Sequence, residues 1–217
     1  MKAQTRTLLS LCLAVVLVLT AVLGTIAYMT ASDTKTNTFT VGSFSQPTTD
    51  PENPGTSLDV DGYIYEKSWV NNSKLVPGSS IAKDPRVGIG AGSEDAWVYV
   101  YIKNNLVTAS GNEVTFKLND GWEPVDATEV TSGSRVYTGG LFKYSTKLNA
   151  ANADDWTTTI FDTVEVASTA TVEGFEKATE KTMVVNAYIH QANDGDTTIP
   201  DTTINDAAKA WVANLGT

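Results

Sequence analysis

Residues 96–102 read AWVYVYI, and this stretch is the strongest indication of the fold class. Side chains alternate between the two faces of an extended strand. Here the even positions carry aliphatic residues and the odd positions carry aromatic residues, so neither face is polar. A strand of this composition is predicted to lie in the middle of a sheet that is covered on both sides.

A second strong strand is predicted at residues 182–190, TMVVNAYIH, where one face carries Met183, Val185, Ala187 and Ile189. Shorter strands are predicted at residues 58–66 (with a break at Gly62), at 114–118, which alternates and is half-exposed, and at 158–166. Residues 136–144 predict a hairpin or a bulged strand, because two glycines separate two short apolar runs. Turn residues recur between these segments, as is typical of all-β proteins.

One segment departs from this pattern. Residues 204–215, INDAAKAWVANL, place Ile204, Ala207, Trp211 and Leu215 at helical spacing and predict a short C-terminal helix that caps the core. The predicted fold is therefore an all-β, antiparallel, jelly-roll-like β-sandwich at residues 57–217 with one late helix. Residues 46–56, QPTTDPENPGT, predict a loop or linker before this domain.

The first 45 residues have the order of an export signal. Lys2 and Arg6 precede an uncharged run over residues 8–29, and a polar, threonine-rich segment follows. One interpretation is a signal peptide at residues 1–27 that is cleaved between Ala27 and Tyr28. The other is an uncleaved anchor, because about 20 apolar residues suffice to span a bilayer. Residues 28–56 then form an N-terminal strand segment and a proline-rich linker. We expect a secreted protein, in the extracellular matrix or at the cell surface.

The composition narrows the function further. Cys12 is the only cysteine and lies within the signal, so residues 28–217 contain no disulfide framework. They carry 13 basic and 25 acidic residues, a net charge of −12. So acidic a chain is repelled by nucleic acid and by anionic membrane surfaces. The expected membrane contact is the signal segment before cleavage.

The residues that usually carry catalysis are scarce. His190 is the only histidine, no zinc-binding motif is present, and no Gly-x-Ser-x-Gly elbow supplies a nucleophile. Residues 193–196, NDGD, favour a turn, with calcium binding as the alternative. Glu123, Asp126 and Glu129 could be paired acids but are interpreted as solvated loop carboxylates. Residues 88–92, GIGAG, lack the lysine of a phosphate-binding loop and are interpreted as a flexible connection. We expect no enzyme activity and no cofactor.

Two blocks of the sequence resemble a known family. Residues 24–30 (GTIAYMT) followed by 37–42 (NTFTVG) look like the signal and mature start of substrates of SipW-type signal peptidase. Residues 75–78 (LVPG), followed by Ile81, Lys83 and Val87, are similar to a block of the TasA/camelysin family. Residues 184–191 followed by a tryptophan-containing helix also resemble many members. The resemblance covers about a third of the chain, and residues 103–180 match no pattern of the family.

The resemblance implies an exported jelly-roll protein that builds fibres of a biofilm matrix after processing by the signal peptidase. In TasA-type fibres the mature N-terminal segment of one subunit adds as a strand to the next. Camelysin is described as a surface metalloprotease, but this chain has no zinc motif, so that activity is not carried over.

The same assembly follows from physical reasoning. The donor strand predicted from the sequence consists of Asn37, Thr38, Phe39, Thr40 and Val41. Such a strand can pair with an exposed sheet edge through main-chain hydrogen bonds. Head-to-tail addition does not close, so the partner is another copy of the chain and the product is a filament. Alternatively, residues 37–45 are the first strand of their own domain, and the donated piece is the shorter segment 28–35.

Two other functions remain open at this point. One is a surface adhesion or carbohydrate-binding module that uses aromatic residues such as Trp122 and Trp156, although the five tryptophans also suit core and rim packing. The other is a camelysin-type secreted metallopeptidase that uses His190.

Overall fold

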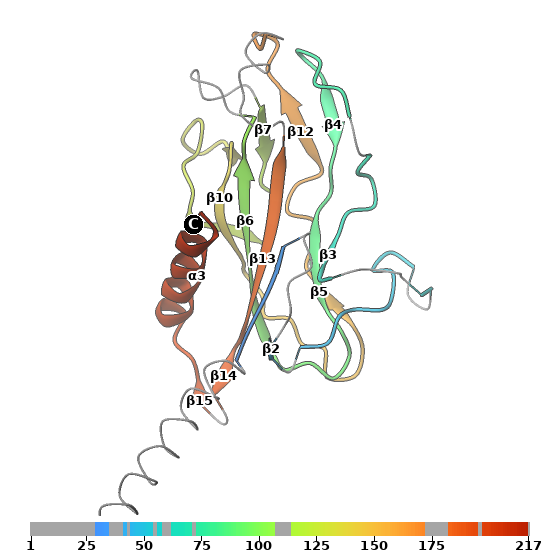
Figure 1. The fold of residues 1–217 in the computed structure, drawn as a ribbon, viewed down its shortest axis with the longest axis vertical. Helices are drawn as coiled ribbons and strands as arrows, with labels where there is room; N and C mark the ends of the chain where they lie inside the picture. Colours follow the sequence, from blue (N-terminus) through green and yellow to red (C-terminus); the bar gives the residue numbers. More distant parts are fainter. Residues whose placement is uncertain are drawn as a thin grey trace, which may run out of the picture.

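The computed structural model describes residues 29–34, 41–42, 44–53, 56–57, 62–70, 73–106, 114–171, 182–194 and 197–216. The predicted signal at residues 1–27 lies outside these ranges. The described residues form four antiparallel sheets and one C-terminal helix (Figure 1), so the all-β prediction is confirmed. Among the described residues, no helix combines the length and apolar composition needed to cross a membrane.

The largest sheet has six strands in the order β2-β1-β13-β6-β10-β8. Their bounds are Val41–Gly42 (β2), Met29–Thr34 (β1), Met183–Gln191 (β13), Ala96–Asn104 (β6), Gly140–Tyr144 (β10) and Trp122–Asp126 (β8).

Two smaller sheets form the second layer. The four-stranded sheet, in the order β4-β12-β7-β9, contains Ser80–Ala82 (β4), Thr163–Val166 (β12), Val114–Lys117 (β7) and Val136–Tyr137 (β9). The three-stranded sheet, in the order β11-β5-β3, contains Asp155–Trp156 (β11), Arg86–Ile89 (β5) and Ile64–Tyr65 (β3). A hairpin of Asn193–Asp194 (β14) and Thr197–Thr198 (β15) leads to the helix α3, Asp201–Leu215.

The predicted central strand is confirmed. β6 pairs with β13 from Ala96 to Asn104 on one side and with β10 on the other. Val98 and Val100 point into the main core, whereas Tyr99 packs on the opposite face against α3. Figure 1 shows α3 on one side of this sheet and strands β3, β4, β5 and β12 on the other. An apolar and aromatic strand therefore lies where both of its faces are covered, as the alternation predicts.

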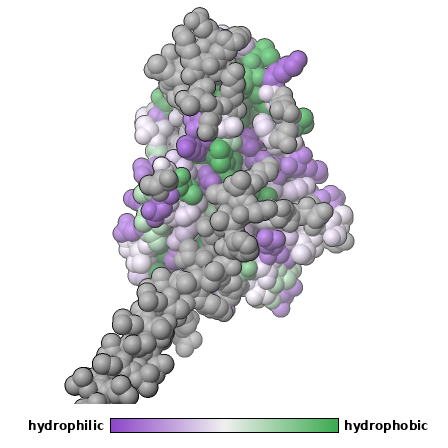
Figure 2. All heavy atoms as spheres, viewed as in Figure 1, coloured by the Kyte–Doolittle hydropathy of each residue, from purple (hydrophilic) through white to green (hydrophobic). Residues whose placement is uncertain are grey.

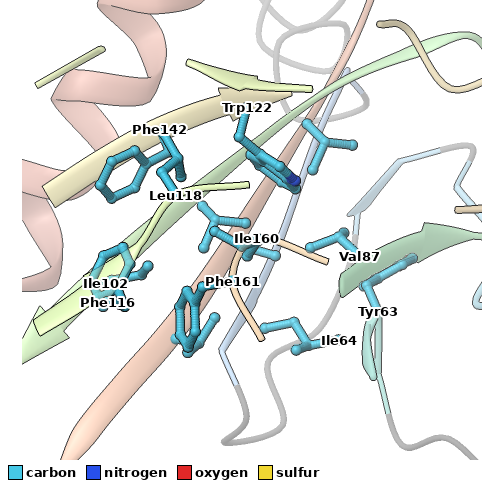
Figure 3. Close-up of a cluster of buried hydrophobic side chains, with 14 of the residues drawn as sticks. Tyr63, Ile64, Val87, Ile102, Phe116, Leu118, Trp122, Phe142, Ile160 and Phe161 are labelled. Carbon is cyan, nitrogen blue, oxygen red and sulfur yellow. The ribbon is translucent and has the colours of Figure 1, made fainter. Parts of the chain in front are cut away.

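The main core lies between the two layers and is rich in aromatic residues (Figure 3). The Phe116 ring lies 4.5 Å from that of Phe161 and 5.8 Å from that of Phe142, measured between centroids. Trp122 belongs to the same cluster and is only 1% exposed. The indole of Trp122 is therefore core packing, and the idea that it contacts a carbohydrate is wrong.

Helix α3 covers the outer face of the six-stranded sheet. It begins at Asp201, three residues before the predicted start, and buries Ile204 and Ala208. Trp211 stacks on Tyr188 at 5.2 Å between ring centroids. The hydroxyl of Tyr99 donates to Asn205 at 2.7 Å, and burial raises the pKa of that hydroxyl. The helix thus covers the aromatic side of β6 and β13, in agreement with the predicted cap.

Residues 136–144 differ from the predicted hairpin. β9 pairs with β7 in the second layer, whereas β10 pairs with β6 and β8 in the first, so the chain turns a corner between layers. Gly140 has a φ of 129°, and a Cβ there would lie 2.4 Å from the Cβ of Ala127. Only glycine fits this corner without displacing the neighbouring chain. A bulge-like register shift does occur further on, between Leu141 and Phe142.

Candidate assembly interface

Strand β1 pairs with β13, and β13 pairs on its other side with the central strand β6. The register runs antiparallel from Thr30 opposite His190 to Thr34 opposite Asn186. Figure 1 shows β1 in blue beside β13. Because β1 starts at the second residue after the predicted cleavage junction, the segment that export would release lies, together with β2, at the end of the main sheet next to β13.

The chain then doubles back, because β2 pairs with β1 through Met29 opposite Gly42 and Thr30 opposite Val41. Of the predicted donor-strand residues, Val41 therefore lies in β2. Asn37, Thr38, Phe39 and Thr40 lie outside the described residues, as do Ala27 and Tyr28. The strand that pairs with the body lies within the shorter segment 28–35.

Immediately after β2 the chain is attached to the body of the domain. Phe44 is buried, and its carbonyl accepts a hydrogen bond from the Tyr63 hydroxyl at 3.0 Å. The Ser45 amide donates to the Ser93 hydroxyl at 2.9 Å, and the Ser45 carbonyl accepts from the Gly90 amide at 2.6 Å. Residues 44–49 therefore form an anchor, and β1 and β2 belong to an arm that precedes it.

Gly90 lets the anchor lie against the body. A Cβ at Gly90 would lie 2.2 Å from the Gln46 carbonyl oxygen, a distance that no side chain tolerates. Gly88 and Gly90 are both buried, and Gly88 and Ile89 belong to β5. The interpretation of residues 88–92 as a flexible connection is therefore wrong for this part, where glycine allows close approach of two chain segments.

Asp154 completes the anchor from a distant part of the sequence. Its Oδ2 accepts hydrogen bonds from the Thr48 amide at 2.6 Å, the Thr49 amide at 2.8 Å and the Thr49 hydroxyl at 2.7 Å. Its Oδ1 accepts from the Ala91 amide at 2.9 Å. Burial raises the pKa of this carboxyl, but the hydrogen bonds favour the charged form more strongly and hold the pKa below its usual value.

The opposite edge of the main sheet is protected against pairing. β8 is the last strand on that side, and it contains Pro124, which has no N–H to donate. Glu123 and Asp126 on the same strand are exposed carboxylates. Proline and charged side chains are the usual means by which an edge strand avoids joining another sheet. Among the described residues, the two edges of this sheet are therefore not equivalent.

The remaining candidates for chemistry do not converge. His190 lies in β13, opposite Thr30 and Trp97, and its Nδ1 lies 2.7 Å from the Gln191 carbonyl oxygen. In the part of the chain that the structure describes, no three His, Cys, Asp or Glu side chains lie together as metal ligands would. Asp194 belongs to the hairpin strand β14, whereas residues 195 and 196 lie outside the described ranges.

Glu129, one of the three acids considered from the sequence, is used locally. Its carboxylate accepts hydrogen bonds from the amides of Gly133 and Arg135 and from the Tyr137 hydroxyl. The bond from Gly133 is the main reason that the pKa of Glu129 lies below its usual value. These contacts hold the turn before β9 and explain the residue without a catalytic role.

Comparison with protein-family models, with curated proteins and with solved structures finds no match. The function of the chain is therefore inferred from its geometry. The sequence does not predict the anchor, because Asp154 lies more than 100 residues from its partners Thr48 and Thr49. The closely spaced glycines at 88–92 were the only visible sign of a close approach.

Proposed function

We propose that this chain is an exported structural protein that forms extracellular fibres of a biofilm matrix or cell surface. Its sandwich has the jelly-roll form, and its subunits join by exchange of the N-terminal strand. The observation that carries the proposal is the position of β1, which directly follows the predicted cleavage junction and completes the sheet at β13. In the fibre, β1 of a second copy would take the same place.

Exchange of β1 between copies conserves the native main-chain hydrogen bonds. The same antiparallel register, from Thr30 opposite His190 to Thr34 opposite Asn186, can form within one chain or between two chains. Strand exchange between identical chains is a low-cost route to assembly, and head-to-tail exchange leaves a free strand and a free edge at the two ends. A filament rather than a closed ring is the expected product.

The anchor supports this proposal because it separates the exchanging arm from the domain. Residues 44–49 are attached through Gly90, Ser93 and Asp154, so the arm can leave β13 without unfolding the body. The protected edge at β8 supports it as well, because pairing there is discouraged by Pro124 and its acidic neighbours. Growth would then use one edge of the sheet and proceed in one direction.

The face of the molecule shown in Figure 2 is compatible with main-chain pairing as the mode of assembly. On the face shown in Figure 2, the hydrophobic described residues form small, separate areas among hydrophilic ones. Docking of broad apolar patches would need a larger continuous area. Strand addition obtains its affinity from the sheet edge, which needs no such patch.

Crosslinking tests the proposal directly, because residues 28–217 contain no cysteine. Thr30 and His190 are register partners, so a chain with Thr30→Cys and His190→Cys can form a disulfide between β1 and β13. We expect oxidised monomers to contain the bond within one chain. Oxidised filaments should instead give a ladder of covalent multimers on non-reducing gels, and each single-cysteine variant serves as the control.

Two outcomes would overturn the proposal. The first is a filament preparation in which the disulfide forms only within chains. The second is equal filament formation, seen by electron microscopy, by a chain that begins at Tyr28 and by one that begins at Phe44. The second chain lacks the whole arm but keeps Phe44 and the anchor that follows.

A further inference from the structure

The N-terminal arm is a hairpin, because β1 pairs with β13 on one side and with β2 on the other. Met29 lies opposite Gly42, and Thr30 lies opposite Val41. Thr30 is also the register partner of His190, so β2 pairs with β1 at the end of the sheet where β13 leads into β14. We call β1 and β2 together the arm hairpin. Its pairing determines how far β1 can move from the anchor.

The connection between the arm hairpin and the anchor is very short. Only Ser43 separates Gly42, the last residue of β2, from Phe44. An extended chain spans at most about 3.6 Å per residue, so the Cα atoms of Gly42 and Phe44 lie within about 7 Å of each other. Phe44 is buried in the main core, which fixes this end of the connection. A hairpin that keeps β2 paired therefore stays close to its own domain.

An intact hairpin that moved to a second copy would bring the two anchors together. Its Gly42 would take the place of the second copy's own Gly42, which lies within the same short distance of that copy's Phe44. The two Phe44 Cα atoms would then lie within about 14 Å of each other. A fibre would need this spacing at every junction, although a domain of this length is about 40 Å across. Two copies that exchange hairpins reciprocally meet the limit only once, so the expected product is a closed dimer.

Separation of β2 from β1 removes this limit. Residues 35–43 then all belong to the connection between β1 and the anchor. From Thr34 to Phe44 this connection can span about 35 Å when it is extended. That length approaches the width of one domain, about 40 Å. Each copy can then donate β1 to the next copy in a row, and the exchange continues as an open filament.

We propose that the pairing of β1 with β2 regulates assembly. While β2 is paired, exchange stops at a closed dimer, and separation of β2 is the step that permits growth of a filament. The inference rests on the proposed function, because it assumes that β1 is exchanged between copies. Two residue pairs hold β2 on β1, whereas five hold β1 on β13. The arm hairpin therefore opens at β2 more readily than β1 leaves the main sheet.

A crosslink between β1 and β2 tests this inference. Thr30 and Val41 are register partners, and partners in antiparallel strands have Cα atoms about 4.5–5.5 Å apart, which suits a disulfide. The exported chain, beginning at Tyr28 and carrying Thr30→Cys and Val41→Cys, is purified with the bond formed within one chain. We expect only monomers and dimers by size-exclusion chromatography with light scattering, and no filaments by electron microscopy. Reduction of the same sample should restore filaments.

Two further chains separate the effect of reach from that of the disulfide itself. Asn193→Cys with Thr198→Cys places the same bond between register partners of the β14–β15 hairpin, which lies outside the arm. This matched control should form filaments whether oxidised or reduced. The second chain keeps the oxidised crosslink in the arm and carries about ten glycine and serine residues inserted after Ser43, which raises the maximum reach to about 40 Å. It should form filaments while β2 stays paired.

The outcomes distinguish this inference from the assembly proposal. If the oxidised arm crosslink leaves filament formation unchanged, the inference is overturned and the assembly proposal stands. Failure of the insertion to restore filaments in the crosslinked chain would show that reach is not limiting, which also overturns the inference. If neither the unaltered chain nor the reduced variants form filaments, the assembly proposal fails and the inference fails with it.

Discussion

Replacement of Asp154 by asparagine should loosen the anchor that attaches the N-terminal arm. Oδ2 accepts three hydrogen bonds of 2.8 Å or less from Thr48 and Thr49, and Oδ1 accepts one from Ala91. An amide has only one acceptor oxygen. If that oxygen faces Thr48 and Thr49, the NH₂ group opposes the Ala91 amide, and two donors then face each other.

The magnitude follows from these bonds. A hydrogen bond to a charged group contributes about 1.5–3 kcal/mol, and a neutral one about 0.5–1.5 kcal/mol. Asp154→Asn removes one hydrogen bond to a charged carboxylate and turns three others into bonds to a neutral oxygen. Because Asp154 is partly exposed, water can replace part of the lost hydrogen-bond energy. We therefore expect the anchor to open more easily by about 2 kcal/mol, which is about 30-fold in the opening equilibrium.

Amide hydrogen exchange measured by NMR reports this opening at single residues. Protection of the Thr48, Thr49 and Ala91 amides should fall about 30-fold in the variant. The Gly88 amide, which donates to the Tyr63 carbonyl, should keep its protection and is the internal reference. A uniform loss over the whole domain would point to global destabilisation.

The pH dependence provides a second and independent check. Because the folded-state pKa of Asp154 is depressed, the charged form stabilises the anchor above the ordinary aspartate pKa. This stabilisation is lost as the pH falls below about 4 and passes through the lower folded pKa. Protection, corrected for intrinsic exchange, should therefore decline with acid in the unaltered chain and stay level in Asp154→Asn. Equal protection in both chains over the whole pH range would refute the reasoning.

Three further predictions concern stability, measured by urea denaturation. Gly140→Ala should lower the free energy of unfolding by about 3 kcal/mol or more, because the new methyl group adds a steric clash to an unfavourable φ. Gly133→Ala should lower it by only about 1 kcal/mol, because Gly133 has a φ of 76° but no atom within 4 Å of the added Cβ. Similar losses in the two variants would contradict the role of the corner. Glu66→Ala should lower the free energy of unfolding by about 3–5 kcal/mol, because the buried Lys83 ammonium, 2.6 Å from the Glu66 carboxylate, loses this partner. A loss below about 1 kcal/mol would show that the pair is solvated. Tyr99→Phe should lower the free energy of unfolding by about 1 kcal/mol, because it removes the hydrogen bond to Asn205 in α3 and leaves the core unchanged. An unaltered midpoint of urea denaturation would count against the observed docking of the helix.

Much of the fold could be predicted because its strongest elements are local in character. The strands at 96–104 and 183–191 follow from alternation alone, and the helix at 201–215 follows from the spacing of Ile204 and Trp211. The boundary of the last strand of the second layer was less accurate, because β12 begins at Thr163 and not at 158. Residues 157–162 make single long-range hydrogen bonds, such as the one from Thr157 to Val87, and periodicity does not reveal these.

The candidate sites were predicted only in part. Trp156 was singled out from the sequence, and the structure places its half-buried indole against the backbone of Gly88 in the three-stranded sheet. Trp122 was singled out on the same grounds and lies in the core. The two residues are indistinguishable by type, and only the pairing of their strands decides which one faces solvent.

The all-β fold class follows from the amino-acid sequence alone. Alternating apolar strands, a single late amphipathic helix and an acidic chain without cysteine after residue 12 are all local or compositional properties. Long-range packing determines at which end of the main sheet β1 lies, where the arm is anchored and which tryptophan is buried. Strand order and long-range contacts depend on how distant segments pack together, and neither the spacing nor the composition of one segment contains that information.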